Sequence, residues 1–136
     1  MPHITAEYSA NLEAALDVQT LLDVLHESAL RTGVFPVGGL RTRAARREHY
    51  RIADGHADNA FVHVIMHIGH GRDLDTRKRA AETVFAALCA HTEHVFTRQP
   101  IGLSLELQEI DPQLNYKKNN LHDYVKQRQG AAEGTQ

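Results

Sequence analysis

The order strand, helix, strand occurs twice in this 136-residue chain, and this repetition restricts the fold more than any other feature. Alternating or β-branched apolar residues indicate the strands, and apolar positions three and four apart indicate the helices. Residues 2–58 and 60–112 form the two halves, and their offset of roughly 60 positions is typical of a duplication. The expected elements are strands at 2–8, 40–52, 61–68 and 101–110 and helices at 16–30 and 75–92. Gly33 is expected to end the first helix and Asp75 to cap the start of the second, whose inward side chains are expected to be Ala80, Val84, Phe85 and Leu88.

This order predicts the fold class. A helix between two strands joins them as parallel neighbours through a right-handed crossover. Two such units predict an α+β domain in which a four-stranded sheet carries both helices on one face. The other face then needs a cover, and because the chain has no third layer, we expect a second copy to supply it. We expect one domain over residues 1–128, ending in a short helix at 120–128, and a flexible tail at 129–136.

Composition excludes several classes of function. The net charge is −2, which leaves no basic surplus for binding nucleic acid or an anionic membrane. No apolar run approaches the ~20 residues that span a bilayer, and the start of the chain does not resemble a signal peptide. Cys89 is the sole cysteine, so no internal disulfide forms, and its apolar helical context predicts a packed side chain. We therefore expect a cytoplasmic protein.

Pro2 directly follows the initiating methionine. Methionine is usually removed when the next side chain is small, and its removal would leave Pro2 with a free secondary amine. An N-terminal amine is one of the few groups that titrate near neutral pH, which makes Pro2 a candidate general base. The alternative is that Pro2 only begins an edge strand, where proline is tolerated.

Two arginines are candidates for binding a carboxylate. Arg72 follows the third expected strand in a glycine-flanked turn, where an accessible guanidinium can grip a carboxylate with two hydrogen bonds. The alternative for Arg72 is a surface ion pair with Asp73 or Asp75. Arg41 follows two glycines and shares a strand face with Arg43, so it either reaches a ligand or belongs to a solvated basic face.

His63, His67 and His70 invite a metal interpretation, but their spacing does not support one. On a strand, His63 and His67 lie ~13 Å apart at ~3.3 Å per residue, too far to share an ion. His91 and His94 are a better pair near a helix end, yet they lack a third ligand. The chain also lacks a glycine-rich phosphate loop and the usual hydrolase motifs. We therefore expect no metal site.

The amino-terminal proline, the duplicated unit and the arginine at the strand-to-helix turn together resemble the tautomerase superfamily. Within it, the chain is most similar to the 5-carboxymethyl-2-hydroxymuconate isomerase family, and the matching stretches appear in the family's order along nearly the whole chain. These stretches are residues 1–3, 32–43, 53–55, 60–63, 68–72 and 114–122.

The resemblance implies a homotrimer whose sheets face a shared core, and an isomerase of homoprotocatechuate degradation that needs no cofactor. The implied reaction converts 5-carboxymethyl-2-hydroxymuconate to its 2-oxo isomer by proton transfer through the amine of Pro2. Arg72 would be the second catalytic residue, and Arg41, from the same or a neighbouring subunit, would bind a substrate carboxylate. Tyr116 and Phe35 would line the substrate pocket.

Two other functions fit the same residues. One is a different proline-amine tautomerase or hydratase that acts on a 2-oxo or enol acid and needs fewer carboxylate-binding groups. The other is a non-catalytic trimeric binder of small organic acids, in which Arg41 and Arg72 bind the ligand and Pro2 has only a structural role.

Overall fold

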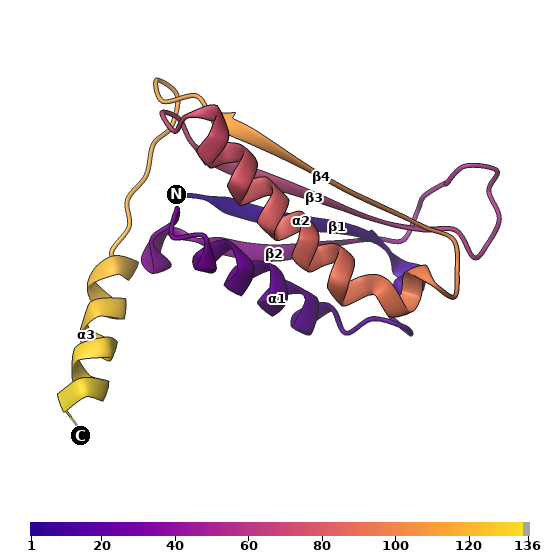
Figure 1. The fold of residues 1–136 in the computed structure, drawn as a ribbon, viewed down its shortest axis with the longest axis horizontal. Helices are drawn as coiled ribbons and strands as arrows, with labels where there is room; N and C mark the ends of the chain where they lie inside the picture. Colours follow the sequence, from indigo (N-terminus) through magenta and orange to yellow (C-terminus); the bar gives the residue numbers. More distant parts are fainter. Residues whose placement is uncertain (135–136) are drawn as a thin grey trace.

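A four-stranded mixed sheet in the order β2-β1-β3-β4 is the frame of the computed structural model (Figure 1). The structure describes residues 1–134, with side chains through Ala131. The elements are β1 (His3–Ser9), α1 (Val18–Arg31), β2 (Arg41–Arg47), β3 (Ala60–Gly69), α2 (Leu74–Phe96), β4 (Ile101–Ile110), α3 (Leu121–Gly134) and the short 3-10 turns η1 (Ala10–Leu12) and η2 (Val37–Gly39).

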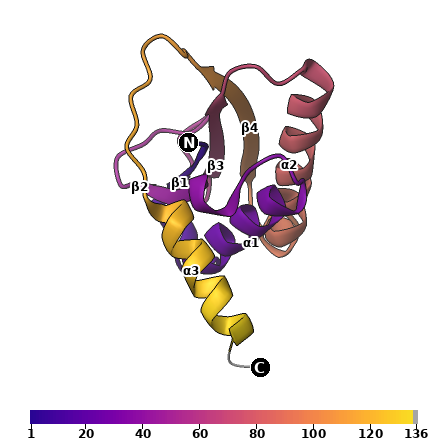
Figure 2. The same cartoon turned by 90° about the vertical axis from the view of Figure 1, so that its left-hand side faces the viewer.

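The two halves have the predicted topology. In each half a long helix joins two parallel strands, α1 between β1 and β2, and α2 between β3 and β4. The halves meet at the centre of the sheet, where β1 and β3 pair antiparallel. Both helices lie side by side on one face of the sheet, as Figures 1 and 2 show. The predicted α+β class and the single helical layer are therefore confirmed.

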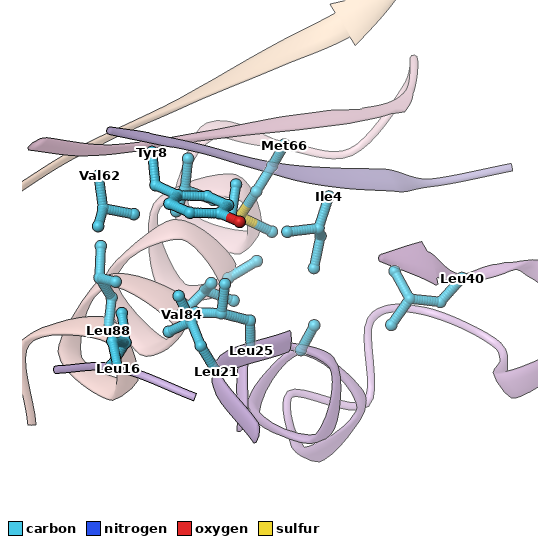
Figure 3. Close-up of a cluster of buried hydrophobic side chains, with 14 of the residues drawn as sticks. Ile4, Tyr8, Leu16, Leu21, Leu25, Leu40, Val62, Met66, Val84 and Leu88 are labelled. Atoms are coloured by element: carbon cyan, nitrogen blue, oxygen red, sulfur yellow. The ribbon is translucent and has the colours of Figure 1, made fainter. Parts of the chain in front are cut away.

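The core lies between the sheet and these two helices (Figure 3). Alternation along the central strands turns one set of side chains toward the helices and leaves the other set half-buried on the opposite face. Burying each large apolar side chain contributes roughly 1.5–3 kcal/mol. The core side chains labelled in Figure 3 are Ile4, Tyr8, Leu16, Leu21, Leu25, Leu40, Val62, Met66, Val84 and Leu88.

Several local predictions need correction. Phe85 was expected in the core but is 36% exposed, because Ala80, Val84 and Leu88 form the buried row of α2 and position 85 lies about 100° around the helix from Val84. The N-cap of α2 is Asp73, not Asp75: its carboxylate accepts a hydrogen bond from the Thr76 amide at 2.8 Å. Helix α2 therefore begins one residue early, and it continues to Phe96.

Strand β2 and helix α3 also differ in length from the prediction. Strand β2 ends at Arg47, because its last partner on β1 is Ser9, and residues 48–59 then form a loop. Helix α3 continues six residues past the expected end at 128, where the good helix formers Gln129, Ala131, Ala132 and Glu133 alternate with two glycines. Of the segment expected as a tail, 129–134 is thus helical, and residues 135–136 lie outside the described residues. No helix in the described residues is long and apolar enough to cross a membrane.

Candidate active site

The antiparallel pairing of β1 with β3 brings the start of the chain to the turn that follows β3. His3 lies opposite His67, so the residues just before β1 and those just after β3 meet at the same end of these two central strands. The Arg41 amide donates a hydrogen bond to the carbonyl of Pro2 at 3.1 Å, which fixes the backbone there. Pro2 and Arg72, remote in sequence, therefore line one pocket.

This pocket has a volume of about 450 Å³, in the range of small-molecule sites. One wall comes from the start of the chain, from the segment through η2 and from the turn after β3. The other wall comes from the irregular segment before α3 and from the first turn of α3. The lining residues are Met1, Pro2, Pro36, Gly39, Gly69, Arg72, Lys117, Asn119 and His122.

Arg72 is held in a fixed orientation. Its Nη1 donates to the carbonyl of Gly69 at 3.2 Å, and its Nη2 donates to the carbonyl of Val34 at 3.3 Å. Its guanidinium also lies over the ring of Phe35. Among the described residues Arg72 forms no ion pair with a carboxylate, because Asp73 is engaged in capping α2. The geometry thus favours ligand binding over the surface ion pair.

The turn that carries Arg72 depends on Gly71. Its φ of +117° lies in a region that residues with a side chain rarely adopt. The backbone reverses there between β3 and α2, and Arg72 reaches the pocket just before the helix begins. The flanking glycines therefore have the role that the sequence indicated.

The terminal amine of the chain lies at the pocket. With Met1 present, this amine belongs to Met1, and the nitrogen of Pro2 is an amide. Burial lowers the pKa of the amine below its usual value, and the positive charges of Lys117, Arg41 and Arg72 lower it further. A basic group at this position is therefore easier to keep unprotonated near neutral pH than an exposed amine.

Arg41, Phe35 and Tyr116 do not line this pocket. Arg41 lies on the edge strand β2, where its Nη1 donates to the carbonyl of Gly39 at 2.9 Å. Phe35 is 5% exposed and lies beneath Arg72. Tyr116 is 86% exposed and does not line the pocket formed by its own chain. Pro2 and Arg72 are therefore the two expected residues that this chain brings together.

Lys117, Asn119 and His122 line the pocket but were not singled out from the sequence. They lie within 114–122, a stretch that carried part of the family resemblance. Because residues 111–120 have no regular secondary structure, no periodicity indicates which side chains face the pocket. Pro36 was missed for the same reason.

The histidine-rich strand does not form a metal site. His63 bonds Ser104 at 2.6 Å and His67 bonds Gln108 at 2.6 Å, each across to β4 on the face of the sheet opposite the helices. Within residues 1–134, no group of three or more metal-ligating side chains is found. Cys89 is half-buried in α2 and lies outside the pocket.

Comparisons with known proteins agree with one another. The model of the 5-carboxymethyl-2-hydroxymuconate isomerase family matches residues 2–125. A 5-carboxymethyl-2-hydroxymuconate Delta-isomerase from Escherichia coli is 35% identical over 126 residues, which are 93% of this chain and 100% of that protein. A crystal structure of a 5-carboxymethyl-2-hydroxymuconate isomerase from Deinococcus radiodurans R1 is 37% identical, with a TM-score of 0.85 over 91% of this chain and 93% of that chain. A second crystal structure, of a 5-carboxymethyl-2-hydroxymuconate delta-isomerase, is 29% identical, with a TM-score of 0.85 over 92% and 93% of the two chains.

Proposed function

Because the chain belongs to the 5-carboxymethyl-2-hydroxymuconate isomerase family, we propose that it converts 5-carboxymethyl-2-hydroxymuconate to its 2-oxo isomer in homoprotocatechuate degradation. The observation that carries the proposal is the pocket shared by Pro2, Arg72 and the terminal amine. A dienol with several carboxylates needs a base beside a fixed cation, and this pocket offers both.

The proposed reaction is a proton shift through the amine of Pro2. Removal of Met1 exposes this secondary amine at the pocket. The amine takes the proton of the 2-hydroxyl group, the oxygen's electron pair forms the C2 carbonyl, and the conjugated double bonds shift. The protonated amine then returns the proton to a carbon atom of the substrate, so the substrate neither gains nor loses a proton overall. The reaction requires neither a redox group nor a metal.

The surroundings support this use of the amine. Burial and the nearby cations lower the pKa of the Met1 amine, and the same surroundings would act on the amine of Pro2. A lowered pKa keeps the base unprotonated at neutral pH and makes its conjugate acid a better proton donor. Arg72, held in place over Phe35, would bind the carboxylate beside the reacting hydroxyl and stabilise the charge that develops on its oxygen.

The proposed enzyme is a homotrimer. The helices cover only one face of the sheet, and the other face carries half-buried side chains such as Thr5 and Ile65. Burying this face between copies would complete the layered fold. Arg41 and Tyr116 lie outside the pocket of their own chain, which supports their use in the pocket of a neighbouring subunit.

The test is an ultraviolet assay of dienol decay with 5-carboxymethyl-2-hydroxymuconate, after mass spectrometry has confirmed loss of Met1. We expect decay well above the spontaneous rate, and a large loss of kcat/KM in Pro2→Ala. Pro112→Ala, changed in the turn after β4 at a residue that does not line the pocket, is the control and should retain activity. No acceleration by correctly processed protein would contradict the substrate assignment. Unchanged turnover in Pro2→Ala would contradict the role of the amine.

A further inference from the structure

The two walls of the pocket have different origins. One wall belongs to the body of the domain, where Pro2 and Arg72 lie. The other is a C-terminal arm, defined here as residues 115–122, which carries Lys117, Asn119 and His122. Figures 1 and 2 show that α3, which follows the arm, extends away from the sheet. The position of the arm therefore depends on its contact with η2.

Asn119 and Gly38 fix that contact. The Asn119 side chain donates through Nδ2 to the carbonyl of Gly38 at 3.1 Å, and its Oδ1 accepts from the amide of Leu121 at 2.9 Å. Asn119 thus attaches the arm to η2 and forms an Asx turn that leads into α3. A Cβ at position 38 would lie 2.8 Å from the Cα of His122, so the two backbones approach too closely for any side chain there.

The arm adds positive charge to a pocket that contains no carboxylate. The cationic side chains of its lining are Arg72 on the body wall and Lys117 on the arm, and none of its lining residues is acidic. Burial is the largest cause of the lowered pKa of the Met1 amine, and the charge of Lys117 is the next largest. Cations on the two walls of a pocket that is also lined by Met1 suit an anion that carries carboxylates at both ends.

We infer that Lys117 is a specificity-determining residue that binds the carboxylate distal to the reacting enol, while Arg72 binds the proximal one. The C-terminal arm, through Lys117, would therefore make the pocket prefer dicarboxylates to monocarboxylates. The inference rests on the proposed function, since it assigns the reacting end of the substrate to Arg72 and Pro2. Lys117 does not perform the proton transfer, so its removal changes substrate choice more than it changes the chemical step.

Calorimetric titration of processed protein tests the inference without turnover. The probes are adipate, a six-carbon dicarboxylate, and hexanoate, the monocarboxylate of the same length. We expect wild-type protein to bind adipate more tightly than hexanoate. In Lys117→Met, adipate should bind at least three-fold more weakly, while hexanoate affinity should change by less than two-fold. Lys118→Met is the matched control, because Lys118 neighbours Lys117 but does not line the pocket, and it should leave both affinities within two-fold.

Three outcomes would overturn the inference: no preference for adipate in wild-type protein, no loss in Lys117→Met, or an equal loss for both probes. The result is separable from the proposed function. A protein that fails to turn over the dienol but loses adipate preference in Lys117→Met refutes the isomerase and supports Lys117. An active isomerase in which Lys117→Met keeps the full wild-type preference for adipate refutes the role of Lys117 alone.

Discussion

The guanidinium of Arg72 lies over the ring of Phe35, with its Cζ atom 5.3 Å from the ring centroid. The ring is buried, so it supports the arginine from below and makes no contact with the pocket. Together with the two backbone carbonyls that accept from Arg72, it limits the motion of the guanidinium before a ligand arrives. When a carboxylate binds there, the Arg72 side chain therefore loses little additional conformational entropy. We propose that Phe35 is a positioning residue for Arg72.

Replacing Phe35 by leucine should weaken catalysis more than its effect on folding explains. Loss of a cation–π contact, at about 1 kcal/mol, corresponds to roughly a five-fold fall in kcat/KM. Leucine keeps the site apolar, so the free energy of unfolding should fall by only about 1–2 kcal/mol. Steady-state kinetics and urea unfolding measure the two effects.

An aromatic ring at position 35 should restore the kcat/KM that Phe35→Leu loses. Phe35→Tyr should recover most of kcat/KM, while Phe85→Leu, on the exposed side of α2, should leave it unchanged. A Phe35→Leu protein with wild-type kcat/KM would refute the positioning role. A Phe35→Tyr protein as impaired as Phe35→Leu would refute it as well.

The pH dependence of kcat/KM should report the terminal amine. The amine acts as a base in its free form, so kcat/KM should rise with pH as the amine loses its proton and then level off. Burial and Lys117 both lower the pKa of the Met1 amine, and the same surroundings would act on the amine of Pro2, which places this rise at lower pH than for an exposed amine. Removing the charge in Lys117→Met favours the protonated amine, raises its pKa and moves the rise to higher pH.

The control for this experiment is Lys118→Met, which should keep the wild-type pH profile. The activity ratio of wild type to Lys117→Met should be largest at acidic pH and smaller on the plateau, where only substrate binding differs. A profile that is unchanged, or that moves to lower pH, in Lys117→Met would show that Lys117 does not act on the amine.

The element order could be predicted because both halves carry strong periodicity. Alternation in β1 and β-branched residues in β3 left little ambiguity, and Gly33, with a φ of +72°, ends the α1 region as expected. Residues at element ends were less well determined. Asp73 and Asp75 both have N-cap chemistry, and only the backbone path decides that Asp73 reaches the amide of Thr76.

The candidate site was predicted in part. Pro2 and Arg72 were each marked by their own chemistry, and their meeting depends on a long-range pairing of β1 with β3 that neither segment encodes alone. Lys117 and Tyr116 are sequence neighbours on a segment without regular structure, so no period distinguishes the residue that faces the pocket from the one that faces solvent. When a residue serves the pocket of a neighbouring subunit, the sequence of one chain has no pattern that indicates this role.

Introducing a side chain at Gly38 should displace the C-terminal arm. Its Cβ would lie 2.5 Å from Nδ1 of His122 and 2.8 Å from its Cα, and the second contact cannot be relieved by rotating the imidazole. We expect Gly38→Ala to raise KM for the dienol about ten-fold and to speed proteolysis within residues 111–120. The melting temperature should change little, because α3 packs mainly on η2 rather than on the core.

Gly130→Ala is the matched control. A Cβ at position 130 meets no atom within 4 Å, and alanine is favoured in a helix such as α3. This variant should keep the wild-type KM and proteolysis rate. If Gly38→Ala matched it in both measurements, the arm would not depend on the close approach of Gly38 to His122.

The open face of the sheet should assemble three copies of the chain. Light scattering of wild-type protein should give three times the chain mass. Ile65 lies near the centre of this face, between Thr5 on β1 and Glu106 on β4, so Ile65→Arg would place a long charged side chain between subunits. Taking a guanidinium out of water costs several kcal/mol even beside a carboxylate, which is enough to dissociate an oligomer. We therefore expect Ile65→Arg to be a monomer.

Dissociation should also remove activity if Arg41 serves a neighbouring pocket. Ile65→Arg leaves Pro2, Arg72 and Lys117 in place on their own chain, so adipate binding should persist while turnover falls at least ten-fold. Phe96→Arg is the control: Phe96 is a 56% exposed apolar residue at the end of α2, on the helical side of the molecule, and its change should leave the trimer intact. A monomeric wild type that is fully active would refute both the assembly and the shared site. A monomeric but fully active Ile65→Arg would refute the shared site alone, because each pocket would then be complete within one chain.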